Sequence, residues 1–177
     1  IKMSFPYRNT VKKDKNWKLD KNVRYHNTLT WKPNGLWYEI KDCLFRWGEL
    51  DWGDQIYELK VDTKCICSIK NFEDLEKFHS KYAKKFNFKS DSEIIKSYLI
   101  NWKKVSKEYC GFEIKNYHKI RKQSDTYYTN SRGFKYLWAD TIDFSSGCIW
   151  DLNAIKSASY FRKVGKREKN KLFESED

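Results

Sequence analysis

The chain has 177 residues and a formal net charge of +12, because 36 Lys and Arg outnumber 24 Asp and Glu. Hydrophobic residues are 40% and aromatic residues 18% of the sequence, and this composition excludes a disordered chain. No apolar run approaches the roughly 18 residues that a membrane-spanning helix needs, which excludes a membrane-embedded protein. A chain of this length is expected to form one domain.

The cysteines are odd in number and have no repeating spacing: Cys43, Cys65, Cys67, Cys110 and Cys148. A disulfide framework is typical of shorter secreted chains with an even number of cysteines, and zinc sites usually pair their ligands in CxxC or HxxxH motifs. The N-terminal stretch also lacks the apolar region of a secretory signal. The sequence therefore predicts no structural metal and a reducing, intracellular location, cytoplasmic or nuclear.

The N-terminal part of the chain predicts a basic arm followed by two strands. Residues 1–22 are polar and basic, so we expect them to form an arm outside the domain. A first strand is expected around residues 23–26, and the Pro-Asn-Gly sequence at 33–35 indicates a turn. Residues 36–40 are rich in aromatic and β-branched side chains, which is typical of a strand.

Two further strands and a helix are predicted next. Residues 56–61 and 65–69 alternate between apolar and polar side chains, which indicates half-buried strands. Asn71 is a good N-cap residue, and apolar side chains then recur every three or four positions to about residue 82. This spacing predicts an amphipathic helix that begins after Asn71.

The second half of the chain is predicted from the same periodicities. Residues 84–89 are expected to form a basic connector, and the apolar spacing of residues 94–109 predicts a second helix. A short strand is expected at residues 112–114. The polar, basic stretch 115–132 is expected to form an exposed loop.

The remaining core segments are predicted at residues 134–142 and 147–150, and residues 162–177 are expected to form a charged tail. The domain would therefore span residues 23–161. Because strands and helices do not alternate regularly along the chain, the fold class is predicted to be α+β rather than a doubly wound sheet.

The densest group of chemically useful side chains lies near the first predicted strands. The chain reads His-Asn-Thr at residues 26–28 and Gly-Leu-Trp-Tyr at residues 35–38. One interpretation is purely structural: a hairpin-like core element in which the imidazole of His26 is hydrogen-bonded. The other interpretation is a binding site built on a strand, a tight turn and a second strand.

These two motifs resemble those of the His-Tyr type of ADP-ribosyltransferase, in which a first strand ends in His-Gly-Thr or His-Gly-Ser and a later strand reads Gly-Ile-Tyr-Phe. The resemblance covers roughly residues 23–52. It implies an α+β domain with two small, mostly antiparallel sheets flanking a cleft, with packed helices. It also implies transfer of ADP-ribose from NAD, the substrate, to a macromolecule such as DNA, RNA or an acidic protein, without a metal.

The resemblance assigns a role to several side chains of this sequence. His26 would donate a hydrogen bond to a ribose hydroxyl, and Thr28 would help position the amide of the nicotinamide. Flat rings would stack on the nicotinamide, and Trp37, Tyr38 and Trp47 are the candidates.

A carboxylate is needed as well, because cleavage of the nicotinamide–ribose bond creates an oxocarbenium-like centre. In the family this carboxylate is a glutamate late in the fold. The late segment 138–151 contains no glutamate, so Asp143 and Asp151 are the candidates, with Ser146 as a possible polar substitute. Cys148 in the same segment is interpreted as a buried, inert thiol.

The positive charge suggests an alternative function, a non-enzymatic nucleic-acid-binding module. Lysines neutralise phosphates, and tryptophan and tyrosine rings stack on unpaired bases. The basic residues of the middle segment are the candidates for this surface: Lys103, Lys104, Lys107, Lys115, Lys119, Arg121 and Lys122. A third possibility is an interaction protein whose eight tryptophans fill the core.

Overall fold

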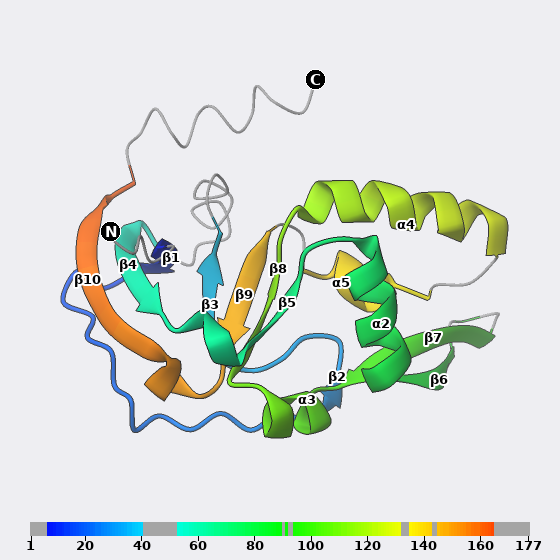
Figure 1. Ribbon diagram of the computed structural model, residues 1–177, viewed down its shortest axis with the longest axis horizontal. Helices are drawn as coiled ribbons and strands as arrows, with labels where there is room; N and C mark the ends of the chain where they lie inside the picture. Colours follow the sequence, from blue (N-terminus) through cyan, green and yellow to red (C-terminus); the bar gives the residue numbers. More distant parts are fainter. Residues whose placement is uncertain are drawn as a thin grey trace.

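A seven-stranded mixed sheet forms the larger part of the computed structural model, which describes residues 7–40, 53–89, 91, 94–131, 135–142 and 145–164 (Figure 1). In spatial order its strands are β10 (Ile155–Lys163), β4 (Gln55–Val61), β1 (Tyr7–Lys12), β3 (Leu36–Glu39), β9 (Ser146–Ile149), β8 (Gly111–Ile114) and β5 (Ile66–Ile69). Neighbouring strands are antiparallel except for the parallel pair of β5 and β8.

A three-stranded antiparallel sheet lies beside the first, in the order β2 (Leu29–Thr30), β7 (Ile94–Asn101) and β6 (Ala83–Lys89). The helices of the described residues are α2 (Phe72–Tyr82), α3 (Trp102–Glu108), α4 (Tyr117–Ser131) and α5 (Leu137–Asp140). Figure 1 shows β10 curving along one end of the molecule, whereas α2, α4 and α5 gather at the other end. The predicted α+β class and single domain are confirmed, although the larger sheet has seven strands.

Helix α2 begins and ends where the sequence predicts. The side chain of Asn71 accepts a hydrogen bond from the backbone N–H of Asp74, and Glu73 and Asp74 lie in the first turn, where the helix dipole favours acids. The buried face of the helix includes Leu75 and Phe78. This face packs on the larger core, where the Phe78 ring lies 5.3–5.7 Å from three other aromatic rings, those of Trp102, Phe112 and Trp138.

The prediction of one helix over residues 94–109 is wrong in its first half. Residues Ile94–Asn101 form β7, and the helix α3 begins only at Trp102. The apolar spacing of this stretch fits a helix or a strand, and it forms a strand because its backbone pairs with β6. Asn101 then caps α3, because its side chain accepts from the backbone N–H of Lys104.

Four more predictions are corrected by the sheets and helices. Residues 84–89 belong to β6 rather than to a connector, and residues 117–131 form α4 rather than a loop. Residues 23–26 lie in a loop, and Val23 is 41% exposed. The charged sequence Tyr7–Lys12 is an interior strand, so this part of the predicted arm belongs to the sheet. The sheet supplies partners for two of the strand's polar side chains, because Arg8 bonds Glu113 and the Thr10 hydroxyl donates to the carbonyl of Trp37.

The C-terminal boundary of the domain also lies further along the chain than predicted. Strand β10 continues to Lys163, beyond the predicted limit at residue 161. Residues 165–177, the rest of the predicted tail, lie outside the described residues. None of the helices in the described part of the chain is long and apolar enough to cross a bilayer.

A disulfide joins Cys65 and Cys110, which lie 45 residues apart in sequence and 5.4 Å apart between Cα atoms. It links the starts of the parallel strands β5 and β8, where the backbone N–H of Cys110 donates to the carbonyl of Cys65. The count and spacing of the cysteines gave no indication of this disulfide. Disulfides persist mainly in oxidising compartments, so this bond weighs against the predicted reducing location. The intracellular location stays a prediction.

Candidate active site

A cluster of charged and polar side chains lies inside the molecule on one face of the seven-stranded sheet. It joins Arg8 of β1, Tyr38 of β3 and Glu113 of β8, which are 1%, 0% and 1% exposed. These strands are not all neighbours, because β9 lies between β3 and β8. Tyr38 reaches across β9 above Gly147, where a Cβ atom would overlap its ring. The glycine therefore makes room for the contact between two distant strands.

Glu113 is the centre of this cluster. The guanidinium of Arg8 donates from Nε to Oε2 at 3.1 Å and from Nη2 to Oε1 at 2.9 Å, so the pair is bidentate. The hydroxyl of Tyr38 donates to Oε2 at 2.7 Å. A carboxylate that accepts three charge-assisted or hydroxyl hydrogen bonds is both ionised and fixed in orientation.

The partners of Glu113 decide its ionisation. Burial alone would raise the pKa of its carboxyl, but the hydrogen bonds and the charge of Arg8, together with Tyr38 and Lys115, lower that pKa below its usual value. Burial and the neighbouring Glu113 carboxylate raise the pKa of Tyr38 well above its usual value. The cluster therefore contains a carboxylate, a guanidinium and a neutral phenol at neutral pH.

The cluster approaches the molecular surface at Lys115. The ammonium of Lys115 lies 3.5 Å from Oε1 of Glu113, and this lysine side chain is 36% exposed. On the other side, the register of β5 and β8 places Ser68 next to Glu113, and the Ser68 hydroxyl is buried without a hydrogen-bond partner in the described structure. A ligand that reached Glu113 past Lys115 would meet a positive charge first.

A second buried glutamate lies on the opposite face of the same sheet. Glu39 follows Tyr38 directly in β3, so its side chain points to the other side. It is 0% exposed, and both of its carboxyl oxygens lack a hydrogen-bond partner in the described structure. Burial raises the pKa of Glu39 to about 9. The Oδ1 atom of Asn9, the residue opposite Glu39 in β1, is also buried without a partner.

The structure does not bring His26, Thr28, Trp37 and Tyr38, the NAD candidates that it describes, together in one pocket. His26 and Thr28 are exposed and lie in the loop that precedes β2, rather than at the end of a strand. The backbone carbonyl of His26 accepts from the side chain of Asn34, and the carbonyl of Thr28 accepts from the backbone N–H of Trp102. Asn27 between them is buried and exchanges two hydrogen bonds with the backbone of Asn34.

The predicted stacking residues lie in different environments. Trp37 is half-buried and packs against the larger core, whereas Tyr38 is fully buried on the other face and holds Glu113. Tyr38 therefore has no free ring face for a nicotinamide. Trp47 lies outside the described residues.

Of the two candidate aspartates, the structure describes only Asp151. Asp151 is exposed, and its side chain accepts from the backbone N–H of Asn153 as the cap of a short 3₁₀ turn (Leu152–Ala154). Asp143 lies outside the described residues. Cys148 is fully buried, and burial raises the pKa of its thiol well above the usual value, which agrees with an inert side chain.

Sequence reasoning missed both charged members of the cluster. Arg8 was assigned to an arm because its neighbours are polar, and Glu113 stands in a short apolar strand whose carboxylate was not considered. A charged residue flanked by Phe112 and Ile114 in a strand with no exposed position is the signal that could have identified Glu113. Nothing in the local sequence pairs it with Arg8, which is 105 residues away.

A small hollow of about 180 Å³ lies beside β5 and α2. Cys67, Ser68, Asp74, Lys81 and Tyr109 are among its lining residues. Burial raises the pKa of the Cys67 thiol to about 11, so this thiol is not an activated nucleophile. The hollow is smaller than the roughly 300–1,000 Å³ of typical ligand sites, and none of the predicted NAD residues lines it.

Comparisons with protein-family models, with curated proteins and with solved structures found no match for this chain.

Proposed function

We propose that this protein is an ADP-ribosyltransferase-like enzyme that transfers ADP-ribose from NAD to a macromolecule, with Glu113 as the catalytic carboxylate. The observation that supports this function best is the three-way contact of Glu113 with Arg8 and Tyr38. The resemblance requires an aromatic residue on an early strand and a glutamate on a later one. Tyr38 belongs to the Gly-Leu-Trp-Tyr motif, and its hydroxyl bonds the Glu113 carboxylate directly.

Glu113 has the properties that the reaction needs. An ionised carboxylate can accept a hydrogen bond from a ribose hydroxyl and stabilise the positive charge that develops at C1′. Arg8 keeps this carboxylate ionised in a buried place, and Tyr38 fixes its orientation. In this proposal Arg8 and Tyr38 are positioning residues, and Lys115 attracts the anionic dinucleotide toward the cluster.

The reaction balances without a metal or a redox partner. The bond between C1′ of the ribose and the nicotinamide nitrogen breaks, and the electron pair leaves with the neutral nicotinamide. A nucleophilic oxygen or nitrogen of the acceptor then forms the new bond to C1′ and loses its proton. When water is the acceptor, the products are nicotinamide, ADP-ribose and a proton.

The proposal changes the site residues that the resemblance implied. Glu113 replaces Asp143 and Asp151 as the carboxylate. Trp37 faces the opposite side of the sheet from Glu113, so it is not part of this site. His26 and Thr28 are exposed in a loop, and a role for them stays a prediction.

Ligand-dependent stabilisation tests the proposal. Because a ligand that binds only the folded state stabilises it by mass action, millimolar NAD should raise the melting temperature, whereas AMP at the same concentration should raise it less. The Glu113→Gln variant should lose most of this difference. Equal shifts with NAD and AMP, or no shift with either, would contradict the proposed function.

A further inference from the structure

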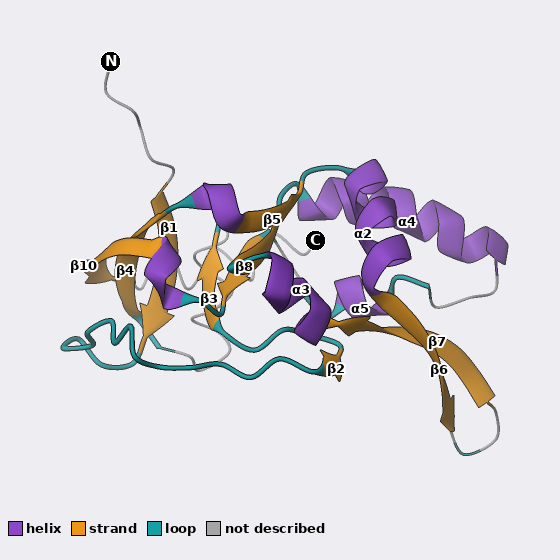
Figure 2. Cartoon of the chain, turned by 60° about the horizontal axis from the view of Figure 1, so that its bottom comes forward, coloured by secondary structure: helices purple, strands orange, loops and turns teal. Residues whose placement is uncertain are grey.

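Strands β6 and β7 form a two-stranded ribbon that projects from the molecule (Figure 2). Their antiparallel pairing runs from Ala83 opposite Ile100, at the base, to Lys89 opposite Ile94, at the tip. The base is anchored, because Ala83 and Ile100 pack in the larger core and β2 pairs with the end of β7. The outer part of the ribbon is held by its own ladder of hydrogen bonds.

The register gathers positive charge on the ribbon. Residues that face each other across the two strands lie on the same side, so Lys85, Asn87 and Lys89 share one face with Lys96. Lys84 is on the opposite face near the base. All four lysines are exposed, and none forms an ion pair with a carboxylate of the described residues. Neither β6 nor β7 contains an acidic residue.

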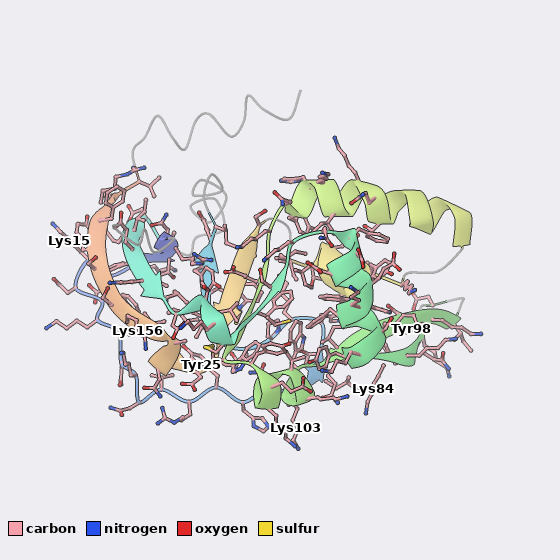
Figure 3. All side chains as sticks on the ribbon, in the orientation of Figure 1. Lys15, Tyr25, Lys84, Tyr98, Lys103 and Lys156 are labelled. Atoms are coloured by element: carbon pink, nitrogen blue, oxygen red, sulfur yellow. A yellow bond between two sulfur atoms is a disulfide. The ribbon has the colours of Figure 1, made fainter. Side chains whose placement is uncertain are left out.

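The opposite face of the ribbon is partly covered. The ring of Phe86 meets Trp31 edge to face with centroids 5.7 Å apart, and Ser97 beside it is 2% exposed. The face with Lys85 and Lys96 is covered only at its base, where Tyr98 packs on His79 and Ile100 enters the core. Its outer part, with Lys85, Asn87, Lys89 and Lys96, is exposed. Figure 3 shows Lys84 and Tyr98 on the side of the molecule where the ribbon lies and Lys15 and Lys156 toward the opposite end, with Lys103 between them at the lower edge.

The aromatic rings of the ribbon are already engaged. Tyr98 meets His79 edge to face with centroids 4.7 Å apart, and Phe86 contacts Trp31. Proteins that bind single-stranded nucleic acid stack its bases on free aromatic faces. The described rings of the ribbon are packed against other rings, which favours a duplex over a single strand as the ligand.

We propose that the β6–β7 ribbon binds duplex DNA, with the face of Lys85, Asn87, Lys89 and Lys96 in the major groove. Strands of a ribbon lie about 5 Å apart, and the major groove of B-form DNA, about 12 Å wide, admits a two-stranded ribbon. Lysines neutralise the flanking phosphates, and an amide such as Asn87 can bond an adenine edge. The major groove of duplex RNA is deep and narrow and excludes such a ribbon.

This inference goes beyond the transferase proposal and does not depend on it, because DNA binding is measured without NAD. It places the sequence-based alternative of a nucleic-acid-binding surface on the ribbon rather than on the middle segment. In that segment, Lys115 contacts Glu113, Arg121 lies 3.4 Å from Asp140, and Lys104 lies over the Tyr82 ring.

Salt-dependent binding of a 20-base-pair DNA duplex to the full chain tests the ribbon. The logarithm of the affinity should fall linearly with the logarithm of the salt concentration. In a variant with Lys85→Gln, Lys89→Gln and Lys96→Gln, the slope should become shallower by about one per lysine, that is by about three. The affinity at low salt should fall at least tenfold, and circular dichroism should confirm that the variant is folded.

A matched control removes the same number of charges at the other end of the molecule. Lys15, Lys18 and Lys156 are exposed, and their change to Gln should leave the slope and the affinity nearly unchanged. An equal loss of DNA affinity and of salt dependence in both triple variants would show that binding depends only on the net charge of the protein. That result would overturn the inference. So would equal affinity for duplex RNA or single-stranded DNA, or no binding of duplex DNA even at low salt.

Discussion

Two glutamates on opposite faces of the same sheet are equally buried and yet have opposite properties. Glu113 is 1% exposed, accepts hydrogen bonds from Arg8 and Tyr38, and has a lowered pKa. Glu39 is 0% exposed, has no partner in the described structure, and has a pKa of about 9. Burial costs the charged form in both places, and at Glu113 the guanidinium of Arg8, together with Tyr38 and Lys115, offsets that cost. The partner, and not the burial, decides which glutamate is a carboxylate at neutral pH.

Removing the Arg8 guanidinium should cause the largest loss of stability. We expect Arg8→Met to lower the free energy of unfolding by about 3–5 kcal/mol at pH 7, because it leaves a buried carboxylate without its counter-charge. Glu113 with its lowered pKa contributes stability that is present above the unfolded pKa of about 4.5 and is lost as the pH falls through the folded pKa. The cost of Arg8→Met, measured by urea unfolding, should therefore shrink below pH 4.

The double variant Arg8→Met with Glu113→Gln is the control for that measurement. Replacing both partners removes the unpaired charge, so most of the lost stability should return. If the double variant is as unstable as Arg8→Met alone, packing and not the ion pair explains the loss.

The raised pKa of Glu39 predicts how the stability of the protein changes with pH. Its pKa is raised from 4.5 to about 9 on folding, so its contribution is fully present below the unfolded pKa and is lost as the pH rises toward 9. Between pH 7 and pH 8.5 this group alone should lower the free energy of unfolding by about 2 kcal/mol.

The Glu39→Gln variant isolates that contribution. His79, with a pKa of about 4 because of burial and the nearby Lys135 charge, changes its ionisation below this pH range. The buried thiols of Cys67 and Cys148 affect both proteins equally near pH 9. The difference between wild type and variant should therefore rise by about 2 kcal/mol over this range, and parallel curves would mean that Glu39 is not buried as described.

The smallest effect is expected for the hydroxyl of Tyr38. Tyr38→Phe keeps the ring and removes one hydrogen bond to a charged group, so the free energy of unfolding should fall by about 1.5 kcal/mol at pH 7. Tyr82→Phe is a matched control, because the Tyr82 hydroxyl also donates to a glutamate, Glu108, at the surface. Thermal unfolding should show a smaller loss for Tyr82→Phe, and the reverse order would argue against a special role for the Tyr38 contact.

The fold could be predicted from the sequence where local signals and tertiary contacts agree. Asn71 caps α2 as its sequence indicates, and the alternation of residues 56–61 lies within β4. The prediction was wrong where one pattern fits two structures: the spacing of residues 94–109 suits a helix, but Ile94–Asn101 pairs with β6. Such pairing depends on residues distant in sequence, and a local window does not contain it.

The candidate site was less predictable than the fold for the same physical reason. The motif at residues 35–38 indicated Tyr38, but the partners that give this tyrosine its role come from β1 and β8. Arg8 looks like a solvated charge in a basic stretch until β1 is placed between β3 and β4. A buried ion pair between residues 105 positions apart is a property of the sheet order, and no local stretch of the sequence reveals that order.

The release of nicotinamide from NAD, measured for wild type, Glu113→Gln and Glu39→Gln, tests the proposed function most directly. Both variants remove one buried carboxyl group of the same sheet, so they form a matched pair. We expect wild type and Glu39→Gln to release nicotinamide at similar rates, and Glu113→Gln to be slower by a factor of about 10²–10³, as for the loss of a group that stabilises transition-state charge. No release by the wild type, or a loss in Glu39→Gln with full activity in Glu113→Gln, would contradict the assignment of Glu113.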